Sequence, residues 1–379
     1  MEDLKNSVRS VYIHIPFCKK ICSYCDFCKI YYDDNIAENY LKELEQEIVN
    51  NYKGETIKTL YIGGGTPSSL SSNNLNRLFN LIDIFKKSDD IEFTFECNIE
   101  DIDDKLLKKL KRGGVNRLSI GIESFNSKNL KFLNRYHQTK DINSKISLAK
   151  KEEFKNINID LIYAIPEESF NDLKKDIDEF LKLDITHIST YSLIIEPHTI
   201  LNNKKIKNID EDLDYKMYEY IVSTLKDSGY NHYEISNFSK PGYESLHNLN
   251  YWNNENYYGF GLGASGYIRK TRYDNTKSIT SYLKGKYIKE EKHLSFNDRV
   301  EEEFILGFRK IKGINIESFI SKYAFNPVDL YVVNNLLKEK KLILDDKYLY
   351  INEKYLYQEN DILLQFLGIN YEIEKQNKK

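Results

Sequence analysis

Glycine and proline are scarce in this sequence, and neither sign of charge is in excess. The 379 residues include 17 glycines and 6 prolines beside 30 tyrosines, which excludes the fibrous and disordered classes. The 55 basic and 58 acidic residues leave a formal net charge of −3. No surplus of cations is therefore available to neutralise a nucleic-acid backbone, and we expect no nucleic-acid partner.

Long apolar segments are also missing. No run approaches the roughly 20 consecutive apolar residues of a membrane-spanning helix, so we expect no transmembrane segment. The first ten residues are polar and lack the apolar stretch of a signal peptide. These absences predict a soluble, cytoplasmic protein, and the 41% of hydrophobic residues supplies enough material for a buried core.

Cysteine is rare and unevenly placed. Four of the five cysteines fall between Cys18 and Cys28, and the fifth, Cys97, stands alone. A disulfide framework needs a small secreted chain with scattered pairs, and this chain offers neither. Clustered thiols in a reducing compartment indicate metal ligands instead, whereas we expect Cys97 to be a small buried apolar residue.

Strand and helix patterns alternate along the first half of the chain. Segments rich in β-branched and aromatic residues predict six strands, at residues 11–15, 59–62, 91–96, 117–122, 157–163 and 186–194. Apolar residues at helical spacing predict five intervening helices, around residues 36–48, 75–82, 106–110, 141–154 and 172–183. The alternation predicts an α/β fold with a parallel sheet. Because too few units are present for eight, we expect a partial (β/α)6 barrel with its chemistry at the carboxyl ends of the strands.

The rhythm changes after about residue 195. The pattern predicts a helix over 212–228, a strand over 230–238 and a loop rich in Asn, Tyr and Gly over 247–266. It then becomes helical from about Ser295 and ends in a helix over 330–338 and a hairpin of 342–344 with 348–351. We therefore expect a barrel over 1–240, a loop-rich connecting segment over 241–294 and a small α+β, winged-helix-like module over 295–379.

The sequence Cys18-x3-Cys22-x2-Cys25 directly follows the first strand. Three thiolates at this spacing can hold three irons of a [4Fe–4S] cluster and leave the fourth iron without a protein ligand. The alternative is a zinc site that adds Cys28 as the fourth ligand, although four-thiolate zinc sites usually consist of two separated pairs. On the cluster interpretation, Cys28 is a spare thiol.

Polar groups collect at the predicted ends of the other strands. Residues 63–67 read Gly-Gly-Gly-Thr-Pro after the second strand, and such a turn allows close backbone approach to a ligand. Glu96, Glu123 and Asp160 lie at or near the ends of strands three, four and five. Each could be an ordinary solvated acid, but three carboxylates on one rim can accept hydrogen bonds from ribose hydroxyls and an ammonium group. Arg135 is a candidate partner for a ligand carboxylate.

These motifs carry a family resemblance that extends over nearly the whole chain. The cysteine spacing resembles that of the radical S-adenosylmethionine (radical SAM) superfamily. The chain further resembles the heme chaperones of the oxygen-independent coproporphyrinogen III oxidase-like branch of that superfamily. The segments that carry this closer resemblance are Tyr12-Ile13-His14-Ile15-Pro16-Phe17-Cys18, residues 63–68, Gly114-Val115-Asn116-Arg117-Leu118-Ser119-Ile120-Gly121, Asp160-Leu161-Ile162-Tyr163 and His247-Asn248-Leu249-Asn250-Tyr251-Trp252.

The resemblance implies a set of cofactors and ligands. Cys18, Cys22 and Cys25 would ligate a [4Fe–4S] cluster. S-adenosylmethionine would contact Tyr12, Gly64, Gly65, Thr66, Glu96, Glu123, Arg135, Asp160 and Ser192. The implied partners are an electron donor such as flavodoxin or ferredoxin and heme-accepting apoproteins, respiratory enzymes among the candidates.

Two functions occur in this branch, and the sequence favours one of them. The coproporphyrinogen III dehydrogenases decarboxylate two propionates by radical chemistry, carry an N-terminal extension and have a further cysteine two residues after the third ligand. This chain has Phe27 at that position and about ten residues before its first strand, so the resemblance favours heme delivery over enzymatic turnover. Glu123 and Asn134 depart from the glutamine and glycine that the family generally has at these positions.

The segment from His247 to Trp252 is the candidate heme site. A histidine with a free ring nitrogen can coordinate iron, and Tyr251 and Trp252 can pack on a flat macrocycle. The alternative is a structural segment in which His247 forms only internal hydrogen bonds. His14, on an apolar strand, is expected to be a hydrogen-bonded barrel residue and no ligand.

Overall fold

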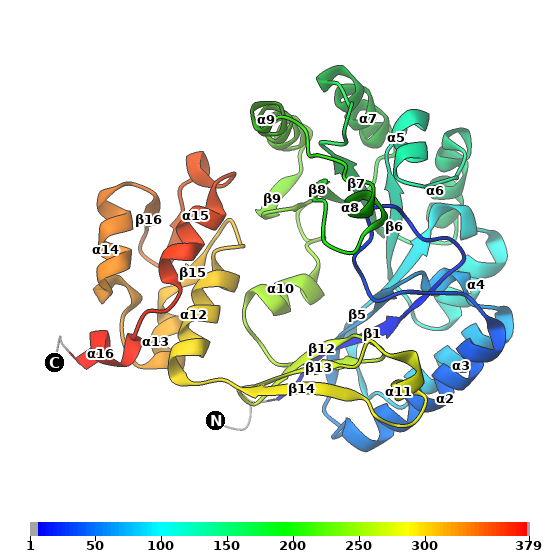
Figure 1. Ribbon diagram of the computed structural model, residues 1–379, viewed down its shortest axis with the longest axis horizontal. Coiled ribbons are helices and arrows are strands. Elements are labelled where there is room, and N and C mark those ends of the chain that lie inside the picture. Colours follow the sequence, from blue (N-terminus) through cyan, green and yellow to red (C-terminus); the bar gives the residue numbers. More distant parts are fainter. Residues whose placement is uncertain (1–6, 377–379) are drawn as a thin grey trace.

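The computed structural model describes residues 7–376, so most of the polar N-terminal segment expected to lack a signal peptide lies outside the described residues. One curved twelve-stranded sheet dominates the molecule, with helices on its convex side (Figure 1). The strand order is β14-β13-β12-β11-β1-β4-β5-β6-β7-β8-β10-β9. A second group of helices with a small sheet forms a separate lobe at the C-terminal end (Figure 1).

Six adjacent strands at the centre of the sheet are parallel and confirm the predicted α/β barrel unit. They are β1 (Ser10–Ile15), β4 (Ile57–Gly64), β5 (Lys87–Asn98), β6 (Arg117–Glu123), β7 (Asn156–Tyr163) and β8 (His187–Ser192). Their alternating side chains place one face toward the covering helices and the other toward the concave interior. Short strands β2 (Phe17–Cys18) and β3 (Ile30–Tyr31) flank the cysteine segment.

The helices between these strands begin at polar caps and bury one apolar stripe each. Ser71, for example, accepts a hydrogen bond from Asn74 N at the start of its helix, as its sequence position predicts. The helices of this part are α2 (Asp34–Asn51), α3 (Ser72–Ile82), α4 (Asp104–Arg112), α5 (Ser127–Phe132), α6 (Ile142–Lys151), α7 (Phe170–Lys182), α8 (Ile200–Asn203) and α9 (Glu211–Asp227). The sequence did not predict α5 and α8, which have six and four residues.

Both edges of the sheet differ from the sequence expectation. The loop predicted over 247–266 is wrong, because this stretch contains helix α10 (Leu246–Trp252), strand β11 (Tyr257–Phe260) and the start of β12 (Ser265–Ile268). The strand predicted over 230–238 is a hairpin of β9 (Asn231–Glu234) and β10 (Asn237–Ser239). The glycines between short aromatic strands gave these segments a loop-like composition.

The segment 241–294 thus contributes to the large sheet. Strand β11 pairs in parallel with β1, and β12, β13 (Thr271–Asn275) and β14 (Ile288–His293) continue the sheet antiparallel. Helix α11 (Ile279–Tyr282) lies between the last two strands. Helix α10 lies on the concave side of the sheet, between its two ends (Figure 1), where Leu246 N donates to Glu92 in the middle of β5.

The C-terminal part confirms the predicted helix and hairpin and has its own apolar cluster around Phe304. Its elements are α12 (Phe296–Gly307), β15 (Ile314–Asn315), α13 (Ile316–Tyr323), α14 (Tyr331–Lys338), β16 (Leu342–Leu344), β17 (Tyr348–Ile351), α15 (Glu359–Leu363) and α16 (Tyr371–Gln376). The three strands form one antiparallel sheet in the order β15-β17-β16. The boundaries at residues 240 and 294 stay a prediction. Within residues 7–376, no helix has the length and apolar character that crossing a membrane requires.

Candidate functional site

A cavity of about 420 Å³ lies at the carboxyl ends of the parallel strands, where a barrel of this type places its chemistry. Its volume is within the usual range for small-molecule sites. Eleven of the residues that the sequence singled out line it: Cys18, Cys22, Cys25, Gly64, Gly65, Thr66, Glu96, Glu123, Arg135, Asp160 and Ser192.

The cysteine segment is anchored at both ends and in its middle. Strands β2 and β3 pair so that Tyr32 N donates to Cys18 O over 2.9 Å. The backbone N–H of Ser23 donates to Leu133 O over 3.0 Å, and its hydroxyl donates to Phe132 O over 2.8 Å. The segment is therefore held against the turn that follows α5.

The three thiols are chemically suited to soft metal ligation. Burial raises the pKa of Cys18 to about 11 and also raises the pKa values of Cys22 and Cys25. The thiols are therefore protonated at neutral pH and lose their protons when a metal binds them. Thr66 Oγ1 lies 3.6 Å from Cys18 Sγ, and Arg135 Nη1 lies 3.8 Å from Cys22 Sγ. Both can donate to sulfur, as cluster ligands require.

No three His, Cys, Asp or Glu side chains among residues 7–376 converge closely enough to hold a single metal ion. A cubane cluster makes a different demand, because each thiolate binds its own iron and the sulfurs surround the cluster. The donor set and its cavity therefore fit a cluster on three cysteines. Cys28 does not line this cavity.

Two side chains near the cysteine segment, those of His14 and Cys97, have the structural roles that the sequence predicts. His14 is buried, with Nδ1 2.9 Å from Tyr12 Oη and Nε2 2.7 Å from Cys28 O, so both ring nitrogens have partners. Cys97 is buried in the main apolar cluster and is a free thiol.

The glycine turn after β4 brings backbone close to two side chains. A Cβ on Gly63 would lie 2.7 Å from the Glu96 carboxyl carbon, and one on Gly64 would lie 2.6 Å from the His14 ring. Gly64 also has a φ of +114°, which disfavours any other residue. Only glycine therefore permits Gly64 N to donate to Glu96 over 3.0 Å.

Two carboxyls of the cavity are buried and hold their protons unusually tightly. Burial raises the pKa of Glu96 to about 7, although Tyr61 Oη donates to it over 2.7 Å. Burial likewise raises the pKa of Asp160, which accepts a hydrogen bond of 2.9 Å from Asn158. Glu96 can therefore change charge near neutral pH, and both groups can accept ligand hydrogen bonds when ionised.

Arg135 and Glu123 form a buried ion pair at the rim of the cavity, with 2.7 Å between Nη2 and Oε2. Arg135 also donates to Asn98 Oδ1 over 2.8 Å and to Gly121 O over 2.7 Å, and Tyr24 Oη donates to Glu123 over 3.0 Å. Burial raises the pKa of Glu123 to about 7 against the opposing effect of Arg135. A glutamate at this position thus binds the arginine that was expected to be available to a ligand.

The second departure from the family pattern has a structural explanation. Asn134 has a φ of +61°, the left-handed conformation that glycine adopts freely and asparagine tolerates best among other residues. Its side-chain amide donates to Ile21 O over 2.7 Å. Asparagine therefore keeps the turn and adds an anchor for the cysteine segment.

Of the two remaining residues expected to contact S-adenosylmethionine, Ser192 lines the cavity and Tyr12 does not. Ser192 lines the cavity at the end of β8, and its hydroxyl donates to Asp214 over 2.7 Å. Tyr12 does not line the cavity, and its hydroxyl is hydrogen-bonded to His14.

Of the two alternatives for His247, the structure has the one in which the ring forms internal hydrogen bonds. The side chain is buried in the concave interior, with Nδ1 2.8 Å from Thr59 Oγ1 and Nε2 2.8 Å from Tyr251 Oη. Burial lowers the pKa of His247 to about 3, so the ring stays neutral. Thr59 lies 188 positions away along the chain, which explains why the motif alone did not reveal the hydrogen bond.

The two aromatic residues of the motif lie at another cavity. Tyr251 and Trp252 line a space of about 360 Å³ that Arg272, Glu302 and Leu306 also border, between α10 and α12. Trp252 Nε1 has no hydrogen-bond partner there among the described residues. The motif residue that reaches the cysteine cavity is instead Asn248.

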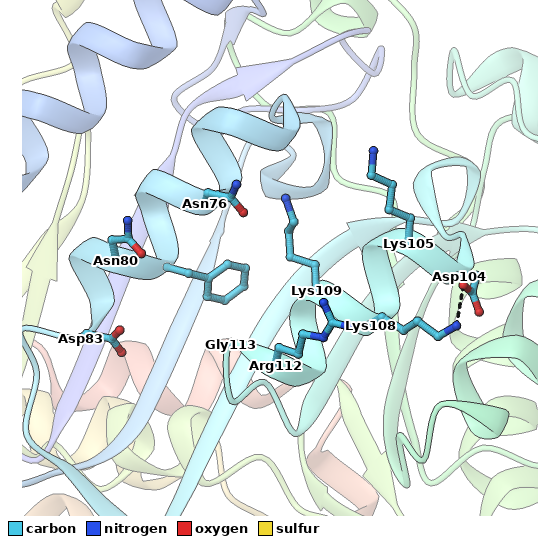
Figure 2. Close-up of a pocket in the computed structure, with 10 residues that line it drawn as sticks. Asn76, Asn80, Asp83, Asp104, Lys105, Lys108, Lys109, Arg112 and Gly113 are labelled. Carbon is cyan, nitrogen blue, oxygen red and sulfur yellow. Dashed lines mark hydrogen bonds and ion pairs between the residues drawn. The ribbon is translucent and has the colours of Figure 1, made fainter.

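A larger cavity, of about 620 Å³, contains none of the expected site residues. It lies between α3 and α4, with Lys105, Lys109 and Arg112 on one side and Asn76 and Asn80 on the other (Figure 2). Its side chains are those of a solvated lysine-rich helix face, and the titratable groups of the strand ends are elsewhere.

Several cavity residues escaped the sequence reasoning. They include Tyr24, Asn98, Arg117, Asn158 and Asn248. The signal that could have revealed Arg117 was its position as a charged residue at the start of an otherwise apolar strand.

Comparisons with known proteins agree with the geometry. Residues 12–180 match the radical SAM superfamily. The chain is 40% identical to the heme chaperone HemW of Lactococcus lactis over 94% of its own length and 97% of that protein. It is 40% identical to the HemW of Bacillus subtilis over 84% and 87%, and 32% identical to that of Escherichia coli over 82% and 85%.

A solved structure confirms the fold. The coproporphyrinogen III oxidase HemN of Escherichia coli, a radical SAM enzyme, superimposes with a TM-score of 0.85 over 95% of this chain and 90% of that one, at 24% identity. At this identity the similarity concerns architecture. Sequence identity over nearly the full length decides the closer relationship, and the chain belongs to the HemW family of the radical SAM superfamily.

Proposed function

We propose that this protein is a heme chaperone, which binds heme and delivers it to apoproteins. The observation that carries the proposal is the 40% identity to a protein named heme chaperone HemW over 94% of this chain. Phe27, in the position of the additional cysteine of the dehydrogenases, supports delivery over turnover. Family members at 32% to 40% identity carry the same name.

Cys18, Cys22 and Cys25 would hold a [4Fe–4S] cluster. They line one cavity, come from one anchored segment and have polar donors near two of the sulfurs. When bound, such a cluster supplies an open iron and one-electron chemistry. The electron donor would be a small redox protein such as flavodoxin or ferredoxin.

S-adenosylmethionine would occupy the cavity beside the cysteines. Gly64, Gly65 and Thr66 would approach the ligand through backbone groups, while Glu96 and Asp160 would accept hydrogen bonds from its N–H and O–H groups. Ser192 and the Glu123–Arg135 pair would border it at the rim. Tyr12 would act through His14, since its hydroxyl is hydrogen-bonded to that ring.

Heme would bind in the same barrel cavity, against the face of α10 that presents Asn248. The smaller cavity beside Tyr251 and Trp252 is the alternative position, and a Trp252→Ala variant distinguishes the two. We further propose that the C-terminal module is winged-helix-like, because helix α14 is followed directly by the hairpin of β16 and β17. Free cysteines support a reducing, cytoplasmic location.

Heme titration followed by transfer tests the proposal. The full-length protein, reconstituted anaerobically, is titrated with hemin and then mixed with an apo-globin as acceptor. We expect saturable binding of one heme per chain and appearance of the holo-globin spectrum. Absence of saturable binding, or retention of heme in the presence of excess acceptor, would refute the chaperone role.

A further inference from the structure

The interior face of the barrel is built in layers, and its lowest layer contains an arginine. Backbone pairing places Thr94, Arg117 and Asn156 side by side on β5, β6 and β7. Two residues further along each strand, in register with one another, come Glu96, Ser119 and Asn158. Because side chains alternate along a strand, both layers face the same side. Arg117 therefore lies below the carboxyls of the cavity and lines its wall.

Arg117 is almost completely buried, with 2% of its surface exposed. Its Nη1 has one long hydrogen bond, of 3.5 Å, to Thr94 Oγ1, and its Nε has no partner. No carboxylate among residues 7–376 forms an ion pair with it. Burying a guanidinium in this way costs several kcal/mol unless a counter-charge compensates it.

The other buried arginine, Arg135, and the half-buried Arg272 and Arg309 are each compensated by a carboxylate. Arg135 pairs with Glu123 at 2.7 Å, Arg272 pairs with Glu302 at 2.7 Å, and Arg309 pairs with Glu359 at 2.9 Å. The fold thus supplies a carboxylate to each of these three cations. Arg117 differs from them and, unlike Arg272 and Arg309, borders the cysteine cavity.

The carboxyls nearest to Arg117 are engaged elsewhere. Glu96 accepts hydrogen bonds from Tyr61 and Gly64, and Asp160 accepts one from Asn158. After burial, the charge of Arg117 is the second cause that lowers the pKa values of His187 and His247. The charge of Arg117 also opposes the rise in the pKa values of Glu96 and Asp160. Its positive field therefore reaches both carboxyls, although neither forms an ion pair with it.

We propose that Arg117 binds a carboxylate of the cargo heme, and thereby orients the macrocycle in the barrel. This inference rests on the proposed function, since heme carries two propionates. Two parallel N–H groups of a guanidinium match the two oxygens of a carboxylate. S-adenosylmethionine also carries a carboxylate, so the test must separate these two sources of the same chemistry.

The test compares two porphyrins on three variants of the cluster-loaded, full-length protein. Hemin and its dimethyl ester, which lacks the negative charges, are titrated into wild type, Arg117→Gln and Arg117→Lys. S-adenosylmethionine is titrated in parallel. Arg112→Gln removes an arginine that borders the separate cavity of Figure 2 and serves as the matched control. Thermal melts show whether each variant folds.

We expect Arg117→Gln to weaken hemin binding by at least about tenfold, the usual size of a charged hydrogen bond. The ester should bind wild type and Arg117→Gln with equal affinity, and Arg117→Lys should recover part of the hemin affinity. An equal loss for both porphyrins, no loss for either, or a loss confined to S-adenosylmethionine would overturn the assignment. If the wild-type protein does not bind hemin, the proposed function itself fails. If wild type binds hemin and Arg117→Gln binds it with the same affinity, the proposed function stands and only this inference fails.

Discussion

The mouth of the barrel cavity and the barrel interior differ in which of their polar side chains already have partners within the protein. At the mouth, the glycine turn and the cysteine segment present thiols, backbone and carboxyls, and the cation Arg135 is already paired with Glu123. In the interior, His247 is hydrogen-bonded through both ring nitrogens, whereas the cation Arg117 forms no ion pair with any carboxylate among residues 7–376 and has one long hydrogen bond, to Thr94. The histidine, which is the more obvious candidate ligand, thus has both ring nitrogens occupied by hydrogen bonds. The arginine, which the sequence did not suggest as a site residue, keeps N–H groups available to a ligand.

This difference shows that residue type alone does not identify a ligand. A histidine or an arginine serves as a binding group only when its polar atoms are left free by the rest of the fold. The mouth is therefore where we expect substitutions to remove a cofactor, and the neighbourhood of His247 is where we expect them to remove stability.

The largest expected effect concerns the mouth. Cys22→Ala removes one of three thiolates, and the reconstituted protein should lose nearly all of its iron and its absorbance near 400 nm. Cys28→Ala is the matched control, because Cys28 lies outside the cavity lining and should leave iron content unchanged. Iron and sulfide analysis decides between them. A full cluster in Cys22→Ala would refute the assignment of Cys22 as a ligand. A lost cluster in Cys28→Ala would add Cys28 to the ligand set.

His247→Ala should act on stability and spare the heme spectrum. The substitution creates a cavity and leaves the hydroxyls of Thr59 and Tyr251 without their partner, at a cost of about 2–4 kcal/mol. Urea unfolding measures the loss, and the exposed His293→Ala should change stability by less than about 0.5 kcal/mol. A shifted Soret band with unchanged stability would restore His247 as an iron ligand.

Glu123→Gln tests whether Arg135 is kept from a ligand by its ion pair with Glu123. The amide keeps the shape of the carboxyl but removes the charge that neutralises Arg135, so the arginine becomes available to a ligand carboxylate. We expect the affinity for S-adenosylmethionine to rise by about tenfold at pH 8. Equilibrium dialysis with cluster-loaded protein measures it, and an unchanged or weaker affinity would show that Arg135 does not meet the methionine carboxylate.

The smallest expected effect is a pH dependence at Glu96. Its pKa is raised to about 7 by burial, so the carboxyl is mostly neutral at pH 6 and mostly ionised at pH 8. An ionised carboxylate is the stronger acceptor for ligand N–H groups, and S-adenosylmethionine affinity should therefore rise several-fold over this range. The comparison is made in the Glu123→Gln background, because burial raises the pKa of Glu123 to about 7 as well and its titration would overlap with that of Glu96. Adding Glu96→Gln should remove the part of this pH dependence that comes from Glu96. If the pH profile of S-adenosylmethionine affinity is the same with and without Glu96→Gln, the assignment to Glu96 is contradicted.

The order of strands and helices in the barrel, and the residues at the mouth of its cavity, could be predicted from the sequence because both depend on local patterns. Period-two strands, helix caps and the cysteine spacing each lie within a short segment. Strand β11 was missed because its four residues acquire strand character only by pairing with β1, 247 positions earlier. The partners of His247 and the isolation of Arg117 also depend on residues far apart in the chain, so no local pattern encodes them.

The central claim is that this radical SAM barrel carries heme and does not synthesise its precursor. The most direct test incubates cluster-loaded protein with S-adenosylmethionine, a reductant and coproporphyrinogen III, and follows protoporphyrinogen by chromatography. Heme is titrated into a parallel sample. We predict no substrate-dependent product and saturable heme binding. Formation of protoporphyrinogen over many turnovers would contradict the account and identify a coproporphyrinogen III dehydrogenase.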